Sequence, residues 1–222
     1  AAHAQDAKCP LVLTGFKWIA EVMRRWEKNG EADFLMGTEE SYGYLVGKHC
    51  RDKDGIVAAC IVGEMAAVAK SRGKTLVDEL YDLYGRHGVH YEWQRSIVMP
   101  GVAGAERMKG ILEMVRSNRP REVGGRKVIR FVNFRSGEVF ENGQKTGETE
   151  LPKSDVFLFD LEDGSRGIVR PSGTEPKIKF YFFLCDNEAG TDYLAIAESE
   201  KKLRATAPVF ENEFFTAIGY SE

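Results

Sequence analysis

Residues 117–126, with the sequence SNRPREVGGR, separate two stretches of the chain that follow different patterns. The segment is polar and contains one proline and two glycines, a composition typical of a connection between domains. Most of the elements predicted before it are helices, and most of those predicted after it are strands. The change of pattern therefore predicts two domains, residues 1–118 and residues 119–222.

The first stretch is predicted to be an α/β domain, with a mixed sheet and helices. Asp54 is a suitable N-cap for a helix over 56–70, and Thr75 and Asp78 form a capping-box-like pair at the next helix. The helix over 56–70 is apolar on most sides, so we expect it to be buried within the layers of a larger α/β unit. The other predicted elements are a turn and helix start within 11–22, strands at 33–36 and 91–98, a loop at 37–53 and a helix at 104–116.

The second stretch is predicted to be an α+β domain, a mostly antiparallel sheet under helices. Asp163-Gly164 is a hairpin signal between two of its strands, and residues 177–184, KIKFYFFL, have strong β propensity. The predicted strands are 128–134, 156–161, 167–170 and 177–184. A helical tail is predicted from 191 to 205, interrupted by Pro208 and resuming toward Ala217.

Charge and composition exclude several classes of function. The chain has 31 basic and 34 acidic residues, a net charge of -3, which gives no attraction for nucleic acid or acidic lipid. No apolar run approaches the roughly 20 residues that a membrane span needs, and the first ten residues lack the features of a secretory signal. The cysteines and histidines show no disulfide or metal-ligand spacing; they are Cys9, Cys50, Cys60, Cys185, His3, His49, His87 and His90. We therefore expect a cytoplasmic protein with reduced thiols and no metal bound by this chain.

Residues 170–176, Arg-Pro-Ser-Gly-Thr-Glu-Pro, have the most chemical content. They lie between two predicted strands and offer a guanidinium, two hydroxyls and a glycine whose N–H a ligand can approach closely. Arginine binds phosphate through paired hydrogen bonds, and hydroxyl and amide donors suit the remaining oxygens. The same residues also suit a tight turn without a ligand, and composition alone slightly favours that alternative.

Residues 37–43, Gly-Thr-Glu-Glu-Ser-Tyr-Gly, form a second candidate segment. In an extended loop the side chains of Glu39 and Ser41 point the same way, because side chains alternate. Both groups can hydrogen-bond neighbouring hydroxyls of a sugar ring. The alternative is a solvated acidic loop or a helix N-terminus, where glutamate is common.

Both segments resemble parts of one family, the α-D-phosphohexomutases, which include phosphoglucomutase, phosphomannomutase and phosphoglucosamine mutase. Residues 170–176, followed by an apolar strand, resemble the phosphate-binding loop of the family's fourth, C-terminal domain. The resemblance implies that the substrate's phosphate is held by Arg170, Ser172, Gly173 and Thr174.

Residues 37–43 resemble the sugar-recognition loop of the third domain, which implies that Glu39 and Ser41 contact sugar hydroxyls. Thr38 stands where many members have glycine, which puts the backbone geometry before Glu39 in question. The flanking residues 42–44, Tyr-Gly-Tyr, are more similar to the glucomutase-like branch than to the short bacterial phosphomannomutases.

Two further segments resemble the family in the expected order. Residues 13–19, with Thr-Gly-Phe-Lys at their centre, resemble an element that precedes the sugar loop in phosphoglucomutases. Lys17 can reach a phosphate or sugar oxygen as a mobile charge, and it suits a solvated surface position equally well. Residues 51–55 resemble the charged turn that opens the following helix, where Asp54 needs no role beyond capping.

Two parts of the family's machinery have no counterpart in this sequence. The family's nucleophile is a phosphorylated serine in a segment like Thr-x-Ser-His-Asn-Pro, and its magnesium loop reads Asp-x-Asp-x-Asp. The nearest lookalikes, residues 52–55 and 160–164, fit a helix start and a hairpin turn, so neither is assigned to a metal. In the family both parts lie in the first two domains. The resemblance therefore implies an N-terminally incomplete third domain and a fragment, whether natural, proteolytic or engineered.

The resemblance implies an isomerase of carbohydrate metabolism, an intramolecular phosphotransferase. The intact enzyme would interconvert hexose 1-phosphate and hexose 6-phosphate with Mg²⁺ and hexose 1,6-bisphosphate. This chain would bind the substrate, hold no catalytic residue, need the missing N-terminal half as its partner and be inactive alone. The alternative is a stand-alone sugar-phosphate-binding or regulatory module, which the coding sequence ahead of Ala1 would distinguish. The choice between glucose, mannose and other sugars stays open, as does the oligomeric state.

Overall fold

The structure is a computed structural model that describes residues 6–172 and 175–220. The chain folds as two compact units, residues 1–82 and residues 83–222. The first unit contains α1 (Phe16–Asn29), β1 (Met36–Thr38), β2 (Tyr44–Val46), α2 (Gly55–Ser71) and the start of α3 (Leu76–His87). The second contains the end of α3, then β3 (Val89–Val98), α4 (Gly101–Ser117), β4 (Glu122–Val123), β5 (Arg126–Asn133), β6 (Glu138–Glu141), β7 (Gln144–Glu148), β8 (Phe157–Leu161), β9 (Arg166–Pro171), β10 (Lys177–Asp186) and α5 (Tyr193–Ala217).

The core of the first unit is small and is built around α1. Phe16, Ile19, Met23 and Trp26 form its buried stripe, at the spacing of one helix face, and they pack with Phe34 and Leu45. β1 and β2 pair as an antiparallel hairpin of three residues each. A Cβ on Gly37 would lie 2.5 Å from the Ile19 side chain. The hairpin can therefore approach α1 this closely only with glycine at that position.

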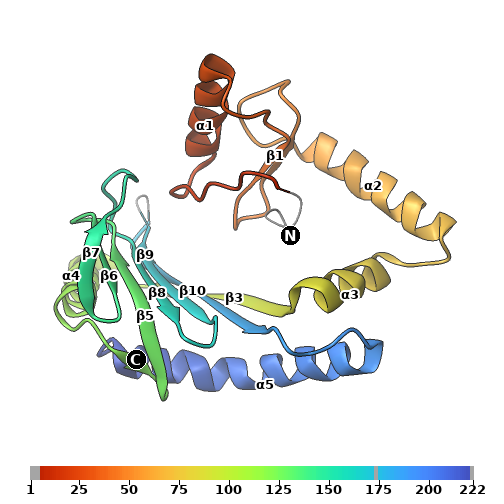
Figure 1. Ribbon diagram of the computed structural model, residues 1–222. Helices are drawn as coiled ribbons and strands as arrows, with labels where there is room; N and C mark the ends of the chain where they lie inside the picture. Colours follow the sequence, from red (N-terminus) through yellow and green to blue (C-terminus); the bar gives the residue numbers. More distant parts are fainter. Residues whose placement is uncertain (1–5, 173–174, 221–222) are drawn as a thin grey trace. The chain divides into compact units, whose positions relative to one another are not determined.

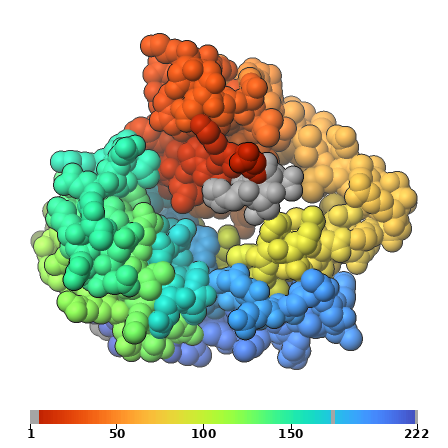
Figure 2. Space-filling model, viewed as in Figure 1, coloured from red at the N-terminus to blue at the C-terminus, as the bar shows by residue number. Residues whose placement is uncertain are grey.

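The predicted caps of α2 and α3 are confirmed, but the predicted burial of α2 is wrong. The Asp54 side chain accepts hydrogen bonds from the amides of Ile56 and Val57, and the Thr75 amide donates to Asp78 at 2.7 Å. Within α2 only Ala69 is buried, and Ile56 is 79% exposed. Most side chains of α2 lie at the molecular surface (Figure 2). The physical reason is that the unit's sheet has two strands of three residues, too small a surface to cover a helix of 17 residues.

The second unit is an antiparallel sheet with helices packed against it, as the sequence predicted for the C-terminal domain (Figure 1). Its strand order is β3-β10-β9-β8-β5-β6-β7, with β4 paired to β5. β10 occupies the interior of this order and pairs along its whole length with β3. Asp163-Gly164 makes the predicted turn between β8 and β9, with Gly164 at a φ of 85°.

Aromatic rings from the sheet and α5 fill the core of the second unit. Phe157, Phe159, Phe180, Phe182, Phe210 and Phe214 are all fully buried. Phe214 packs edge-on against Phe159 and Phe182, with ring centroids 5.4 and 5.3 Å apart. A Cβ on Gly167 would lie 2.2 Å from the Phe214 ring, so glycine lets α5 lie directly on β9.

The boundary between the units differs from the one drawn at 118/119 from the sequence. The compact units meet between Asp82 and Leu83. The reason is the β3–β10 pairing, in which Val89 faces Asp186 and Val98 faces Lys177. This long-range pairing places β3 and the following α4 in the C-terminal unit.

The helical tail also differs from its prediction. α5 runs without interruption from Tyr193 to Ala217, and Pro208 lies inside it. Proline removes one backbone hydrogen bond from a helix. The buried neighbours Ala207 and Phe210 hold both sides of Pro208 against the core, which offsets that loss. Four strands were not predicted from the sequence: β2, which lies within the loop expected at 37–53, and β4, β6 and β7.

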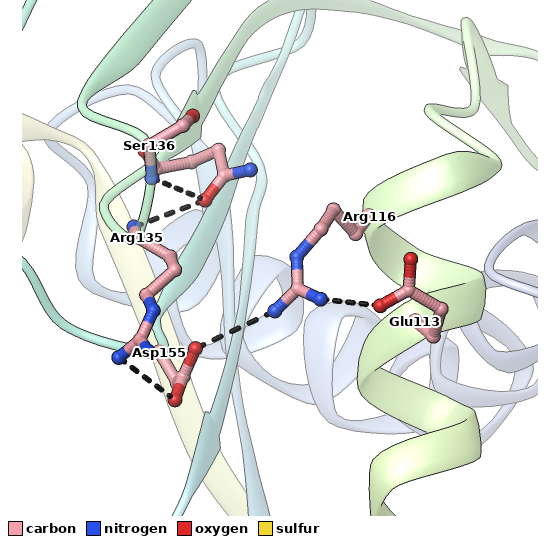
Figure 3. Close-up of polar contacts among 6 residues, drawn as sticks. Glu113, Arg116, Arg135, Ser136 and Asp155 are labelled. Carbon is pink, nitrogen blue, oxygen red and sulfur yellow. Dashed lines mark hydrogen bonds and ion pairs between the residues drawn. The ribbon is translucent and has the colours of Figure 1, made fainter.

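A polar network holds the end of α4 against the segment before β8 (Figure 3). Arg116 donates to Glu113 on its own helix and pairs with Asp155 at 3.5 Å. Asp155 also pairs with Arg135 at 3.7 Å, and the buried Asn133 accepts hydrogen bonds from the amides of Arg135 and Ser136. The network joins the β5–β6 turn to the helix that follows β3.

Among residues 6–172 and 175–220, no helix combines the length and apolar character that a bilayer span requires.

Candidate functional site

Residues 39–43 form the turn of the β1–β2 hairpin rather than the extended loop expected from the sequence. The Glu39 amide donates to the Gly43 carbonyl at 2.8 Å and closes the turn. Tyr42 adopts a left-handed φ of 62° and is 86% exposed. A non-glycine residue in this conformation is uncommon outside turns and functional sites. Strand alternation therefore does not set the directions of the Glu39 and Ser41 side chains.

The Glu39 carboxylate and the Lys53 side chain lie beside Gly43. A Cβ on Gly43 would lie 2.6 Å from Glu39 Oε2 and 3.0 Å from Lys53 Cδ. Asp52 chiefly, and Glu39 to a lesser degree, raise the pKa of Lys53 by stabilising its ammonium. Lys53 could not be predicted from the sequence, because its proximity to Glu39 depends on the fold of residues 44–53. Glu39 at the start of the turn and Lys53, two residues before α2, thus lie close to each other beside Gly43.

The remaining candidates of the first unit have separate surroundings. The Ser41 hydroxyl donates to Glu40 at 3.3 Å. Thr38 is the last residue of β1 and pairs with Tyr44, so the backbone directly before Glu39 is a regular strand. Lys17 lies exposed on the first turn of α1, with its ammonium 4.9 Å from the Trp18 ring centroid. Within residues 6–172 and 175–220, no hydrogen bond or ion pair joins Lys17 to the Glu39 turn.

The candidate phosphate segment begins at the end of β9. Alternation along the strands divides their residues between two faces. Val169, Ile178 and Phe180 are fully buried in the core. Arg170 lies on the opposite face, paired directly with Lys179 of β10. Arg170 Nη1 donates to the Tyr181 hydroxyl at 3.1 Å, which orients the guanidinium.

Two cations facing each other across paired strands destabilise a sheet, and a bound anion reverses that effect. An anion bound by Arg170 and Lys179 would reduce that repulsion further than the attraction between Lys179 and Glu175 does. Lys179 could not be predicted from the sequence, since its place opposite Arg170 follows from the β9–β10 register.

Ser172 lies next to this pair, in the turn that joins β9 to β10. Its amide donates to the Lys177 carbonyl at 2.8 Å, and its hydroxyl accepts from the Glu175 amide at 3.2 Å. Glu175 pairs with Lys177 at 2.5 Å, and this ion pair lowers the pKa of the glutamate. The two other predicted phosphate ligands, Gly173 and Thr174, lie outside the described residues.

The acidic segments of the chain do not fit the Mg²⁺ that the family resemblance implies. Asp160 pairs with Arg130 and Arg166, and Asp163 pairs with Arg126 at 2.9 Å. Mg²⁺ prefers an octahedral set of oxygens not already engaged by cations. Near the start of α2, Asp52 pairs with Lys53 at 3.0 Å. We therefore assign no described residue to magnesium.

The fold and the two sites define the chain as a two-unit protein of mixed α/β and antiparallel α+β structure, with a charged turn on one unit and a cationic sheet face on the other. Residues 1–84 match the family domain described as phosphoglucomutase/phosphomannomutase, alpha/beta/alpha domain III, and residues 106–200 match the C-terminal domain of the same family. The chain belongs to the phosphoglucomutase/phosphomannomutase family and carries its third and fourth domains.

Individual relatives agree with this assignment. The chain is 36% identical over 174 residues to the phosphoglucomutase of Staphylococcus aureus strain MRSA252, and 35% identical over 184 residues to that of strain N315. These matches cover 78% and 82% of this chain but 31% and 33% of the relatives. The chain thus spans about a third of the length of the relatives that it matches.

A solved structure shows the same fold. It is the open form of the exocytosis-sensitive phosphoprotein pp63/parafusin, a phosphoglucomutase from Paramecium. The TM-score is 0.50 at 20% sequence identity, and the match covers 91% of this chain and 34% of that one. At this identity the likeness supports the fold alone.

Proposed function

We propose that this chain is the substrate-binding part of a phosphohexomutase that interconverts hexose 1-phosphates and hexose 6-phosphates. The observation that carries the proposal is the pairing of the half-buried Arg170 and Lys179 on the face of β9 and β10 opposite the core residues Val169 and Ile178, next to Ser172. Two cations and a hydroxyl at one strand end match the charge and the acceptor oxygens of a phosphate monoester. In this proposal Arg170, Lys179 and Ser172 bind the phosphate, together with Gly173 and Thr174.

The sugar-recognition turn supplies the second part of the proposal. Glu39 accepts hydrogen bonds from ring hydroxyls, and the neighbouring Lys53 donates to a sugar or phosphate oxygen. Ser41 provides a hydroxyl that can exchange its Glu40 partner for the sugar. Lys17 is kept as a mobile charge whose reach to the ligand needs a direct test.

The reaction itself needs groups that these residues do not provide. Phosphoryl transfer requires a positioned nucleophile and neutralisation of charge on the phosphoryl group. We propose that the whole protein uses a phosphoserine, Mg²⁺ and a hexose 1,6-bisphosphate, as the family resemblance implies. The 222-residue chain would contribute binding and orientation, and would not turn over substrate by itself.

A titration of the 222-residue chain with glucose 6-phosphate, followed by backbone amide NMR, tests the binding part. We expect shifts at residues 170–172 and 177–179, with a dissociation constant in the millimolar range, about -4 kcal/mol. Lys179→Ala should weaken binding. Lys201→Ala, which removes the same charge from an exposed position on α5, is the matched control. Equal weakening by both variants, or shifts confined to other strands, would refute the assignment.

A coupled assay tests the catalytic part. With Mg²⁺ and glucose 1,6-bisphosphate added, the chain should not convert glucose 1-phosphate. Turnover that persists after further purification would place the nucleophile within these residues and overturn the proposal. Binding of sugar phosphate by the whole protein without mutase activity would favour the stand-alone binding module instead.

A further inference from the structure

Three groups with metal-binding chemistry come together between β2 and α2. One ligand atom from each of His49, Cys50 and Asp54 lies within 4.8 Å of the other two. His49 Nε2 is 2.8 Å from Asp54 Oδ2. The set consists of an imidazole nitrogen, a thiol sulfur and a carboxylate oxygen, and the Glu39 turn contributes none of them.

Backbone contacts hold the loop that carries these groups at both ends. The Gly47 amide donates to the Leu35 carbonyl at 2.9 Å, and the Asp54 amide donates to the Tyr44 carbonyl at 2.7 Å. Gly47 has a φ of 81°, a conformation that turns the chain and that glycine adopts without strain. The ligand atoms are therefore gathered by the fold before any ion binds, which lowers the entropic cost of binding.

The two oxygens of Asp54 have different tasks. Oδ1 accepts the amides of Ile56 and Val57 and caps α2. Oδ2 faces His49, so a metal can bind there without uncapping the helix. A tetrahedral zinc ion with ordinary bond lengths places its ligand atoms about 3.3–3.6 Å apart. The observed separations, from 2.8 Å to at most 4.8 Å, bracket that spacing and need only small side-chain movements.

The surrounding charges do not oppose a cation. Three basic residues lie in the same loop, and each has an acidic partner. Lys48 pairs with Asp33 at 2.6 Å, Arg51 with Glu27 at 2.6 Å, and Lys53 with Asp52 at 3.0 Å. Cys50 packs against the α1 core and is partly buried, so its side of the site has reduced solvent screening.

We propose that His49, Cys50 and Asp54 form a binding site for a zinc ion, with water as the fourth ligand. A nitrogen, sulfur and oxygen set suits Zn²⁺ and Co²⁺, whereas Mg²⁺ prefers oxygen ligands alone. On binding, the Cys50 thiol releases its proton to solvent and the imidazole coordinates in its neutral form. The ion replaces the His49–Asp54 hydrogen bond and the bond that the Cys50 thiol donates to the Asp52 carbonyl at 3.0 Å, and it ties the loop to the start of α2.

Titration of the reduced, tag-free 222-residue chain with Co²⁺ tests the site. We expect one equivalent to bind and to produce a thiolate-to-cobalt charge-transfer band in the near ultraviolet, which Zn²⁺ abolishes and a large excess of Mg²⁺ does not. Cys50→Ser should remove the band, and His49→Gln should weaken Co²⁺ binding at least 10- to 100-fold, the range for a lost supporting contact.

Two further variants separate the metal site from its surroundings. Asp54→Asn keeps a good helix cap, so it should weaken Co²⁺ binding without loss of folded structure. Cys60→Ser changes an exposed thiol on α2 and should leave the band and the affinity unchanged. Absence of a thiolate band in the wild-type chain would overturn the proposal. So would loss of the band in Cys60→Ser with retention in Cys50→Ser, or Co²⁺ affinity unchanged by His49→Gln and Asp54→Asn together.

Discussion

Replacement of Gly167 by alanine should destabilise the second unit, because the new methyl group enters the space of a ring that cannot move. The added Cβ would lie 2.2, 2.7 and 2.8 Å from three ring carbons of Phe214. The ring is fully buried and is held between Phe159 and Phe182, so relief requires α5 to lift by roughly 1 Å. Overpacking of this kind costs about 1–3 kcal/mol.

A second effect opposes the first. Alanine loses less backbone entropy than glycine on folding, which favours the variant by about 0.5–1 kcal/mol. We therefore expect a net destabilisation of about 1–2 kcal/mol, or a fall in Tm of roughly 3–8 °C for a unit of this size. Urea denaturation followed through the indole N–H resonance of Trp93 reports on this unit alone, because Trp93 packs on Phe182 within it.

The same substitution at Gly147 is the matched control. Gly147 lies on β7, and a Cβ there would meet no atom within 4 Å. Gly147→Ala should leave stability unchanged or raise it slightly. In a Phe214→Leu background the penalty at Gly167 should shrink, because the obstructing ring is gone. Equal urea midpoints for Gly167→Ala and Gly147→Ala would refute the packing argument.

Three further predictions concern binding and pH. Arg170→Ala should weaken glucose 6-phosphate binding by about 10- to 150-fold, or 1.5–3 kcal/mol, measured by NMR titration against Lys201→Ala; an unchanged affinity would remove Arg170 from the site. Glu39→Gln should weaken sugar-phosphate binding and spare inorganic phosphate, whereas equal loss of both would give Glu39 a structural role. Ser199 donates to Asp186 at 2.6 Å and lowers the pKa of that carboxyl in the folded state. The folded state is therefore stabilised above the unfolded pKa of about 4, and this stabilisation is lost as the pH falls through the lower folded pKa. Ser199→Ala should therefore flatten the fall of the urea midpoint between about pH 5 and pH 2, and an unchanged slope would contradict this assignment.

Local signals in the sequence predicted local structure well. Asp54 caps α2, Thr75 and Asp78 form the expected pair, and Gly164 makes the β8–β9 turn. Each of these features depends on contacts within a few residues. The unit boundary depends instead on β3 finding β10, about 90 residues further along the chain, and no local pattern in residues 89–98 specifies that partner. The predicted burial of α2 was wrong for a related reason, because the composition of a helix does not reveal which surface is present to cover it.

The candidate site residues also separate into those indicated by local sequence patterns and those that only the fold brings together. Arg170, Ser172, Glu39 and Ser41 were selected as candidates because their segments resemble family motifs. Lys179 and Lys53 were missed because they join those segments only through the β9–β10 register and the path of residues 44–53. The His49, Cys50 and Asp54 cluster was missed because its spacing matches no common ligand motif, and only the folded loop gathers it.

The two faces of β9 and β10 allow stability and binding to be changed independently. Val169, Ile178 and Phe180 point into the core, and Arg170 and Lys179 point away from it. Lys179→Ala removes a like charge opposite Arg170, so it should leave the second unit as stable or slightly more stable while it weakens phosphate binding. Ile178→Ala, one residue earlier on the same strand, should cost about 2–5 kcal/mol of stability and retain phosphate affinity wherever the unit is folded. This pair of results would show that the same strand serves both as part of the core and as a ligand surface. Loss of both stability and binding in both variants would show instead that the two faces are not independent.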